Sequence, residues 1–437
     1  MGHLIEGKEL YKKLGKKIDG LTMRAPWNEA LYNILKELYS PEEAEVVIKM
    51  PYSLASFENI RQLTGLQESK LRARLESLAS KGLVTDIWVR EKDWYIPSPI
   101  AIGIFEFTMM RTGPDLNSKA WAKLFHDYLS DVAFYQANAG HQERVSVMRT
   151  LAHKGVISET DYVEVLDYET ANYVVSQWDK YAIGLCSCRH EKLHVGEKKC
   201  SVPLDTCSSF GMAADYLVRH GMAKEVSKSE MLENIARSKD LKLVLTADNV
   251  KKQPTFICHC CGCCCNILLG ISKYGYPNIL VTSSYLSDVN KDRCTGCGLC
   301  AKGCPIQAIT MIPANQPEAK RREIAQVDKS ICLGCGVCAL HCSRAAIKLS
   351  KRPNAVIHPE TMFERLILQC LERGTLQNQM FTNPDSISHK AMRGIVGGFF
   401  KLTPVKKALM SDQLRSRFLA SMVAGAKRQM GDFAANL

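Results

Sequence analysis

The chain has 437 residues, of which 46% are hydrophobic, and this favours a globular protein of three or four domains. No apolar run reaches the roughly 18 residues that span a bilayer, and the first residues lack the apolar stretch of a signal peptide, so we expect a cytoplasmic protein. The formal charge of +12 counts each cysteine as neutral. Cluster-bound thiolates would cancel part of it, so the charge is weak evidence for a nucleic-acid partner.

The 19 cysteines stand in close-spaced groups such as CTGCGLC. In a long chain without an export signal, this spacing indicates metal ligands rather than a disulfide framework. A reducing cytosol keeps the side chains as thiols, and thiolates are the soft ligands that iron-sulfur clusters require. The pattern predicts an α+β protein of several domains with metal-binding regions.

Residues 24–115 show the pattern of a helical domain that ends in a β-hairpin. A helix with a capping box is expected after Ser40, because Pro41 stands at its first position and Glu43 closes the box. The remaining signals are an apolar face of Leu31, Ile34, Leu35 and Leu38, a cap at Ser56 for a helix through Leu63, a turn at Thr64-Gly65, an apolar stripe of Leu71, Leu75 and Leu78 that ends at Gly82, and strands Leu83–Val89 and Trp94–Ile96 joined by residues 90–93.

This arrangement resembles the winged helix-turn-helix domains of bacterial regulators. The resemblance implies that the helix with Lys70, Arg72 and Arg74 would enter the major groove of DNA. The same charges also suit the solvated face of an amphipathic helix, and winged helices often dock proteins. DNA is therefore an alternative partner, but not the favoured one.

Residues 116–285 are expected to form a helical, cysteine-rich region. It should contain a short strand at Tyr162–Leu166 and a helix from Glu169 to about Tyr181. Ten cysteines follow. The first four are the two cysteines of a CxCR motif and two cysteines that follow it. The other six form the motif CHCCGCCC, a density that packing alone does not explain. The two groups are Cys186, Cys188, Cys200 and Cys207, and Cys258, Cys260, Cys261, Cys263, Cys264 and Cys265.

The first group is long enough in sequence to fold around one 4Fe-4S cube, and a four-cysteine zinc site is the alternative. The second group has more ligands than one cube requires. A second cube is the leading interpretation, with two cysteines serving another cluster or a larger, less usual cluster as alternatives. Gly262 would supply the tight bend.

Three histidines lie among these cysteines, namely His190, His194 and His259. Loop histidines are usually neither ligands nor proton donors, so a structural role is expected for each. Arg189, inside the CxCR motif, is better placed to donate hydrogen bonds to a cluster or to balance its charge.

Residues 286–350 contain a repeat with a 38-residue period. Each unit reads CxxCxxCxxxC, and glycines 296, 298, 334 and 336 let backbone N–H groups approach the sulfurs. Zinc is a weak alternative, because zinc ribbons need two separated CxxC pairs. The two units are Cys294, Cys297, Cys300 and Cys304, and Cys332, Cys335, Cys338 and Cys342.

These motifs resemble the two-cluster bacterial ferredoxins, in which the fourth cysteine of each run ligates the other cluster. The sequence departs from that family at Ser343, where proline is usual, and in the insert from Pro313 to Arg322. The resemblance implies one 4Fe-4S cluster on Cys294, Cys297, Cys300 and Cys342, and a second on Cys332, Cys335, Cys338 and Cys304.

Taken together, the motifs between about residues 160 and 350 resemble a group of iron-sulfur proteins, mostly of anaerobes, that carry CxCR, CCGCCC and a two-cluster ferredoxin in that order. The resemblance implies one or two further iron-sulfur clusters, and it names no reaction.

The tail, residues 351–437, is expected to be helical and basic. Cys370 lies on the apolar stripe of its first helix and should be structural. Ile395–Phe400, followed by Lys401, Lys406 and Lys407, could lie on an anionic membrane, but a packed helical cap is favoured.

Electron transfer between protein redox partners is the leading hypothesis, since no nucleotide loop or nucleophile-base pair is visible in the sequence. An iron-sulfur reductase with substrate at CHCCGCCC and a cluster-controlled DNA-binding regulator are the alternatives.

Overall fold

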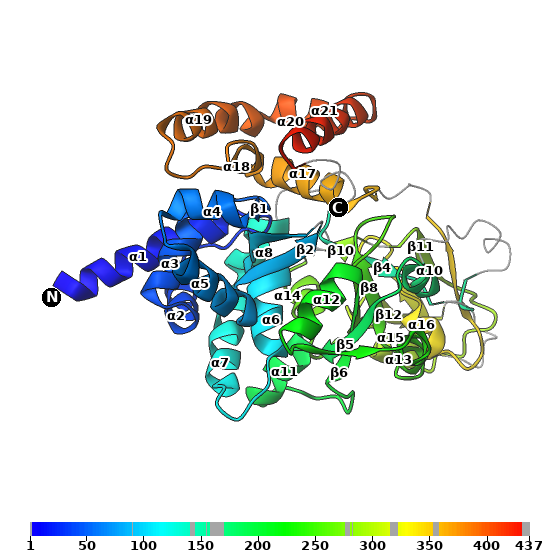
Figure 1. Cartoon of the computed structure of the whole chain (residues 1–437). Coiled ribbons are helices and arrows are strands. Elements are labelled where there is room, and N and C mark those ends of the chain that lie inside the picture. The colour runs from blue at the N-terminus through cyan, green and yellow to red at the C-terminus, as the bar shows by residue number, and fades with distance from the viewer. Residues whose placement is uncertain are drawn as a thin grey trace.

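A computed structural model describes residues 2–89, 91–139, 145–153, 155–157, 170–275, 280–281, 283–314, 322–352 and 358–430. Helices and several separate sheets are mixed along the chain (Figure 1), as the α+β prediction requires. The helices near the N-terminus, the large central sheet and the cysteine-rich repeat follow one another, and the last helices form a separate layer at the top of Figure 1.

The N-terminal elements lie where the sequence predicts them. Ser40 forms the capping box with Glu43, and Ser56 caps the next helix by accepting from the backbone of Asn59. The predicted apolar faces are buried. The elements are α1 Gly2–Asp19, α2 Glu29–Leu38, α3 Pro41–Lys49, β1 Ala55–Ser56, α4 Phe57–Thr64, α5 Glu68–Ser80, β2 Val84–Val89 and β3 Lys92–Pro97, with strand order β1-β3-β2.

This region is tied to the centre of the molecule through its hairpin. Asp86 on β2 accepts from the side chains of Arg219 (2.6 Å) and His220 (2.7 Å). The Tyr216 hydroxyl donates to the backbone of α5 and β2. The hairpin is therefore held against the central region by ion pairs and hydrogen bonds. The elements that link the two regions are η1 Ile100–Ile104, α6 Phe105–Met110, α7 Ser118–Leu129 and α8 Val132–Ala139.

The prediction of a helical region over residues 116–285 is wrong from Met148 onward, because the chain there contributes a seven-stranded sheet in the order β10-β4-β8-β9-β6-β5-β7. All pairs are antiparallel except β10 with β4. Segments such as DTCSSF and FICHC alternate inward and outward, but cysteine and serine conceal the hydrophobic period. The strands are β4 Met148–Leu151, β5 Tyr181–Leu185, β6 Asp205–Phe210, β7 Ala223–Val226, β8 Val244–Asp248, β9 Phe256–Cys260 and β10 Leu280–Val281.

Tyr181 begins β5 instead of ending a helix, and the predicted strand at 162–166 lies outside the described residues. One face of the sheet packs on α10 and α13 through residues such as Ile257 and Met231. The opposite face carries Cys258 and Cys260 and belongs to the main core, together with α14. The helices are α10 Ala171–Ser176, α11 Ser187–His194, α12 Gly211–Arg219, α13 Lys228–Asp240 and α14 Asn266–Tyr274.

The cysteine repeat forms two small antiparallel sheets, each with a short helix that follows a cysteine triplet. β11 pairs with β14, and β12 pairs with β13, so the two units interlock. Part of the Pro313–Arg322 insert lies outside the described residues. The elements are β11 Tyr285–Val289, α15 Leu299–Gly303, β12 Ile309–Pro313, β13 Glu323–Val327, α16 Val337–Leu340 and β14 Ile347–Lys351.

The tail is helical, as predicted, and has its own apolar core. Cys370 is fully buried in that core, and burial raises its pKa to about 11, which fits a structural thiol. In the described part of the chain, we find no helix with the length and apolar character needed to cross a membrane. The helices are α17 Met362–Arg373, α18 Leu376–Met380, α19 Ile387–Lys401, α20 Thr403–Leu409 and α21 Asp412–Met430.

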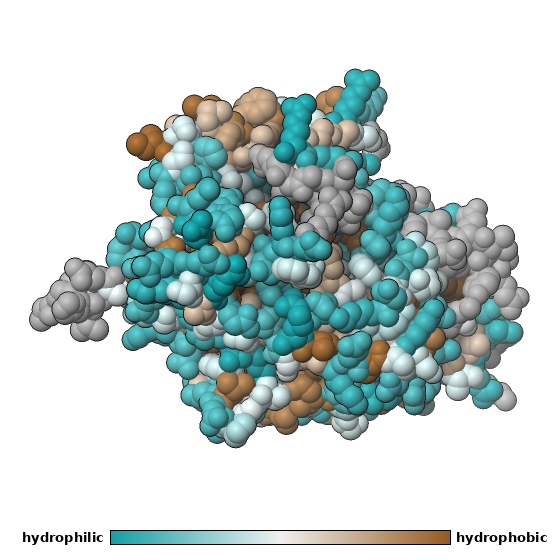
Figure 2. All heavy atoms as spheres, viewed as in Figure 1, coloured by the Kyte–Doolittle hydropathy of each residue, from teal (hydrophilic) through white to brown (hydrophobic). Residues whose placement is uncertain are grey.

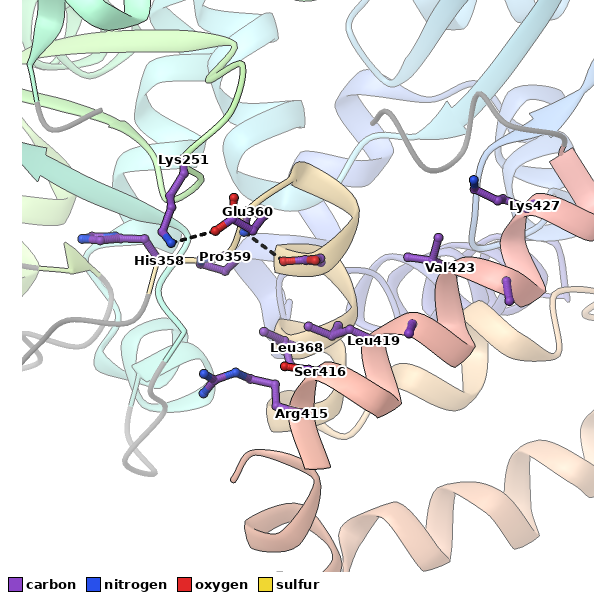
Figure 3. Close-up of a pocket in the computed structure, with 13 residues that line it drawn as sticks. Lys251, His358, Pro359, Glu360, Leu368, Arg415, Ser416, Leu419, Val423 and Lys427 are labelled. Atoms are coloured by element: carbon purple, nitrogen blue, oxygen red, sulfur yellow. Dashed lines mark hydrogen bonds and ion pairs between the residues drawn. The ribbon is translucent and has the colours of Figure 1, made fainter. Parts of the chain in front are cut away.

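Two surface features of the tail are visible. Apolar side chains gather over α19 at the top of Figure 2, among them Ile387, Ile395 and Phe399. A cavity of about 570 Å³ lies between α17 and α21 (Figure 3). Both lysines and glutamates line it, and no cysteine is among the described residues at its wall. None of the predicted site residues therefore lies there.

Candidate metal centres

The first ferredoxin-type set converges on one cavity. Cys294, Cys297, Cys300 and Cys342 line it, although 42 positions separate Cys300 from Cys342 in the numbering. Gly296 and Gly298 have φ values of +74° and +72°, and a Cβ on Gly296 would lie 2.3 Å from the carbonyl oxygen of Glu323. Glycine is required there because the turn passes directly over a neighbouring backbone.

The second set is deeper in the protein. Cys332, Cys335 and Cys338 are buried, whereas Cys297 of the first set is exposed. Burial raises the pKa of Cys304, and the nearby thiol of Cys332 adds to the rise, so these two lie close together. The structure thus brings each triplet together with the last cysteine of the other unit, the arrangement that the ferredoxin resemblance implies.

Backbone donors approach the sulfurs in the same way in both units. The N–H of Ala308 donates to Cys304 Sγ (3.2 Å), and the N–H of Ala346 donates to Cys342 Sγ (3.3 Å). Such N–H···S bonds stabilise thiolate charge and tune the potential of a bound cluster. The donor set and the converging cysteines fit a pair of 4Fe-4S clusters.

The other ten cysteines are grouped differently from their order in the sequence. Cys200, predicted to join the CxCR group, lies 3.7 Å from Cys261 Sγ and 3.9 Å from Cys264 Sγ, measured between sulfurs. We call Cys200, Cys261, Cys263 and Cys264 the outer set, and their four sulfurs all lie within 4.8 Å of one another. The prediction that Cys186, Cys188, Cys200 and Cys207 form one site is therefore wrong.

The six remaining cysteines form an inner set, made of Cys186, Cys188, Cys207, Cys258, Cys260 and Cys265. The neighbouring thiols of Cys207 and Cys260 raise the pKa of Cys258 well above its usual value, so these three lie near one another. The pKa of Cys265 likewise responds to Cys188 and Cys260, which places it near both. Cys186 stands close enough to Cys188 and Cys207 for their charges to raise its pKa, beyond the larger effect of burial. The inner set is thus a connected group of six thiols.

Strand alternation explains why neighbours in CHCCGCCC separate. Cys258 and Cys260 are two residues apart on β9, so they share the face that also carries Cys207 of β6. The chain then turns, and Cys261, Cys263 and Cys264 of that turn face Cys200. Cys265 comes back to the inner set as the N-cap residue of α14.

Positive charge surrounds the inner set. Cys186 is the N-cap residue of α11, so two helix N-termini, of α11 and α14, point toward the thiols. Arg189 is fully buried nearby and donates to the carbonyl of His259 (2.5 Å) and to Thr206 Oγ1 (2.7 Å). Burial alone would lower the pKa of Arg189, but the charges of Cys186 and the neighbouring thiols outweigh burial and raise it.

One donor of Arg189 is left over. Within the described part of the chain, its Nε has no hydrogen-bond partner, although the atom is buried. A buried orphan donor beside two groups of thiols is well suited to a sulfide or thiolate acceptor. Arg189 therefore fits the predicted role of balancing a cluster.

The three histidines have structural partners instead. Both ring nitrogens of His259 bond serine hydroxyls, Ser208 at 2.8 Å and Ser238 at 2.5 Å, on the sheet face opposite Cys258. His190 bonds the carbonyl of Met109 and the ring of His194. Burial lowers the pKa of His259 to about 3, so it stays neutral.

Three polar residues beside the thiols escaped the sequence analysis. The hydroxyl of Ser287 lies 3.1 Å from Cys338 Sγ, that of Thr246 lies 3.7 Å from Cys260 Sγ, and Nδ2 of Asn266 lies 4.0 Å from Cys188 Sγ. Asn266 follows Cys265 directly, which could have marked it. Ser287 and Thr246 come from other strands, and no local pattern indicates them.

The turn that carries three cysteines of the outer set touches the ferredoxin-type repeat. A Cβ on Gly262 would lie 2.8 Å from the carbonyl oxygen of Pro305, the residue after Cys304. Cys258, Cys260 and Cys265 also share the main apolar core with Cys304 and Cys335. The inner set and the deeper ferredoxin-type set are thus parts of one packed interior.

Comparison with known proteins agrees with the repeat and is limited to it. Residues 293–346 match the family model described as a 4Fe-4S dicluster domain. No curated protein and no solved structure matches the chain. This segment is thus similar to domains described as holding two 4Fe-4S clusters, and that similarity is independent of the geometry above.

Proposed function

We propose that this protein transfers electrons between redox partners through a series of iron-sulfur centres. Two 4Fe-4S clusters would be held by Cys294, Cys297, Cys300 and Cys342, and by Cys332, Cys335, Cys338 and Cys304. The inner set would hold a further iron-sulfur centre. The observation that carries the proposal is the direct packing of the Gly262 turn on Pro305, because a relay needs its centres in contact through protein atoms.

The exposed cysteine of the first ferredoxin-type set indicates which end of the relay would meet a redox partner. Cys297 and the neighbouring Leu299 are exposed, the latter by 48%, and Arg293 and Lys291 are exposed beside them. The exposed Asp292 stands between these two cations, so the surface around Cys297 is of mixed charge with an apolar centre, which suits a protein redox partner. Electrons would pass between that partner and the first cluster, then through the buried second cluster to the inner set.

Anaerobic purification with iron, sulfide and zinc quantified per chain tests the relay. The ferredoxin-type clusters account for about 8 iron, so a total clearly above 8, with a third reduced signal by EPR, is expected. A total near 8 would contradict a centre at the inner set. A total well below 8 would contradict the ferredoxin-type clusters themselves.

A reductase is the second candidate, because six thiols exceed the four that one cube needs. The extra ligands could hold an iron with an exchangeable position, where a substrate would bind. An exogenous ligand that changes the EPR spectrum of the inner centre, but not those of the ferredoxin-type clusters, would favour this function. An unchanged spectrum would favour the relay.

A winged-helix layout for residues 24–115 is also proposed, from the helix and strand order and the β1-β3-β2 sheet. DNA binding is not favoured. Arg72 on α5 pairs with Glu68 (3.0 Å) and lies over the ring of Phe57, so it is already engaged. A DNA-binding regulator would require salt-dependent binding of the full chain to duplex DNA, and we expect none.

The tail is proposed to be a packed cap, because α17 and α21 share a buried core. Membrane contact is the alternative, motivated by Ile395 and Phe399 on α19 beside Lys401. Co-sedimentation with anionic liposomes, for the full chain and for the variant Phe399→Ser, should give no difference. A loss of sedimentation in the variant would favour the membrane.

A further inference from the structure

The outer set differs from every other group of cysteines in how closely its sulfurs approach. Cys200 Sγ lies 3.7 Å from Cys261 and 3.9 Å from Cys264, and Cys263 Sγ lies 3.8 Å from Cys261 and 3.5 Å from Cys264. Among the described residues, no other group of three or more cysteines, histidines or acidic residues has all its ligand atoms within 4.8 Å. The ferredoxin-type cysteines are therefore spaced more widely.

The spacing identifies the number of metal ions. Four sulfurs at the corners of a tetrahedron, each about 2.3 Å from one ion, lie about 3.8 Å from one another. A cubane places each thiolate on a different iron, so its four sulfurs must stand farther apart. The four sulfur–sulfur distances scatter around the value for one ion and leave no room for a cube.

We propose that Cys200, Cys261, Cys263 and Cys264 bind a single zinc ion in a closed tetrahedral site. Zinc is the ion that most often occupies four-cysteine structural sites, and it has no redox chemistry. One iron would have the same geometry, and the experiment below separates the two. The inference does not depend on the proposed relay, because the site carries no electrons.

The position of the site gives it a role. Cys200 lies in the loop after α11, and the other three lie in the turn between β9 and α14. Zinc would therefore join two segments whose ligands Cys200 and Cys261 are 61 residues apart, and each segment is flanked in sequence by cysteines of the inner set. The same turn contains Gly262, which packs on Pro305. The ion would fix the turn through which the sheet meets the ferredoxin-type repeat.

The local charge suits an ion with four thiolates. Such a site is doubly negative overall, and the guanidinium of Arg189 lies close enough to Cys261 and Cys200 to interact with their charges. Three of the four cysteines are only partly buried, so the ion can reach them from solvent.

Two measurements on the wild-type full-length chain test the site. After anaerobic purification, we expect about one zinc per chain, and X-ray absorption at the zinc edge should give four sulfur neighbours near 2.3 Å. Absence of zinc, zinc with nitrogen or oxygen neighbours, or a mononuclear iron signal in its place would overturn the proposal. Neither measurement depends on whether a variant folds.

Variants separate this site from the clusters. Cys263→Ser removes a ligand that is only partly buried, and it should lose the zinc while its iron content stays at the wild-type value. Cys370→Ser is the matched control, since Cys370 is buried in the tail, and it should change neither metal. Loss of about four iron from Cys263→Ser, with zinc retained, would mean that the outer set holds a cube. Failure of the relay would instead appear as missing iron with zinc present.

Discussion

The ferredoxin-type repeat and the central sheet both gather cysteines, but they do so by different means. In the repeat, each triplet lies on one tight turn, and Cys342 of the second unit lines the same cavity as the first triplet. In the sheet, the outer set combines one loop with one turn, and the inner set combines two helix N-termini with two strands. The outer sulfurs approach as closely as 3.5 Å, while in the described part of the repeat no three cysteine sulfurs all lie within 4.8 Å of one another.

The local backbone determines whether cysteines that are neighbours in sequence can face the same metal centre. On a tight turn, successive cysteines face one centre, so the motif is the ligand set. On a strand, successive side chains point to opposite faces, and a turn at its end changes the direction again. The six cysteines of CHCCGCCC therefore divide between two sets, although they lie within eight residues of sequence.

The largest expected effect comes from removing ligands in the repeat. Cys300→Ser and Cys342→Ser should each lose about 4 iron and leave the same reduced EPR signal, because both residues line one cavity. Cys304→Ser should instead match Cys338→Ser. Iron analysis and EPR check this, with zinc unchanged throughout. If Cys342→Ser matched Cys338→Ser, each unit would hold its own cluster, and the contrast with the sheet would weaken.

A buried charge on the sheet side comes next. Arg189→Met leaves the thiols of the inner and outer sets without their guanidinium, and breaking such a buried pair costs about 3–5 kcal/mol of unfolding free energy. The midpoint potential of the inner centre should fall, since the reduced state is more negative. Potentials of the repeat should stay as in the wild type. Arg189→Lys keeps the charge and should restore part of the potential; an equal fall in both variants would mean a purely structural role.

The contact between the two regions gives a third test. Gly262→Ala would put a Cβ 2.8 Å from the Pro305 carbonyl oxygen and 2.9 Å from its Cα, both backbone atoms that cannot move aside cheaply. We expect a loss of roughly 2–3 kcal/mol in denaturant unfolding and slower electron transfer between inner centre and repeat. Gly398→Ala, inside α19 with nothing within 4 Å, is the control and should stabilise the protein by about 0.5–1 kcal/mol, because alanine favours a helix interior over glycine. Equal stability of the two variants would mean that the regions do not pack as described.

Local signals in the sequence were enough for the N-terminal elements and the repeat. Ser40, Glu43 and Ser56 act through neighbouring backbone groups, and a cysteine triplet acts within one turn, so a short window contains all the information. The sheet was missed because its strands are short and carry cysteine and serine on their buried faces. The pairing of Cys200 with the Gly262 turn depends on how β6 aligns with β9, where Ser208 pairs with Ile257 and Ser209 with Phe256, and no local pattern encodes that alignment.

The last prediction concerns how the free energy of unfolding depends on pH, and the effect should come from the sheet region and not from the repeat. Burial raises the pKa of Glu106 to about 7, and its backbone carbonyl accepts from Ser187, between Cys186 and Cys188. A carboxyl group with a raised folded-state pKa stabilises the fold at low pH, and that stability is lost as pH rises from about 4.5 through 7. Glu106→Gln cannot ionise, so its stability relative to wild type should be about 2–3 kcal/mol higher at pH 8 than at pH 5. Denaturant unfolding at both pH values measures this, with Glu45→Gln, an exposed site on α3, as the control.

A constant difference between Glu106→Gln and wild type at both pH values would show that the carboxyl group does not titrate in this window. An altered EPR signal of the repeat at pH 8 would show that the two regions respond together.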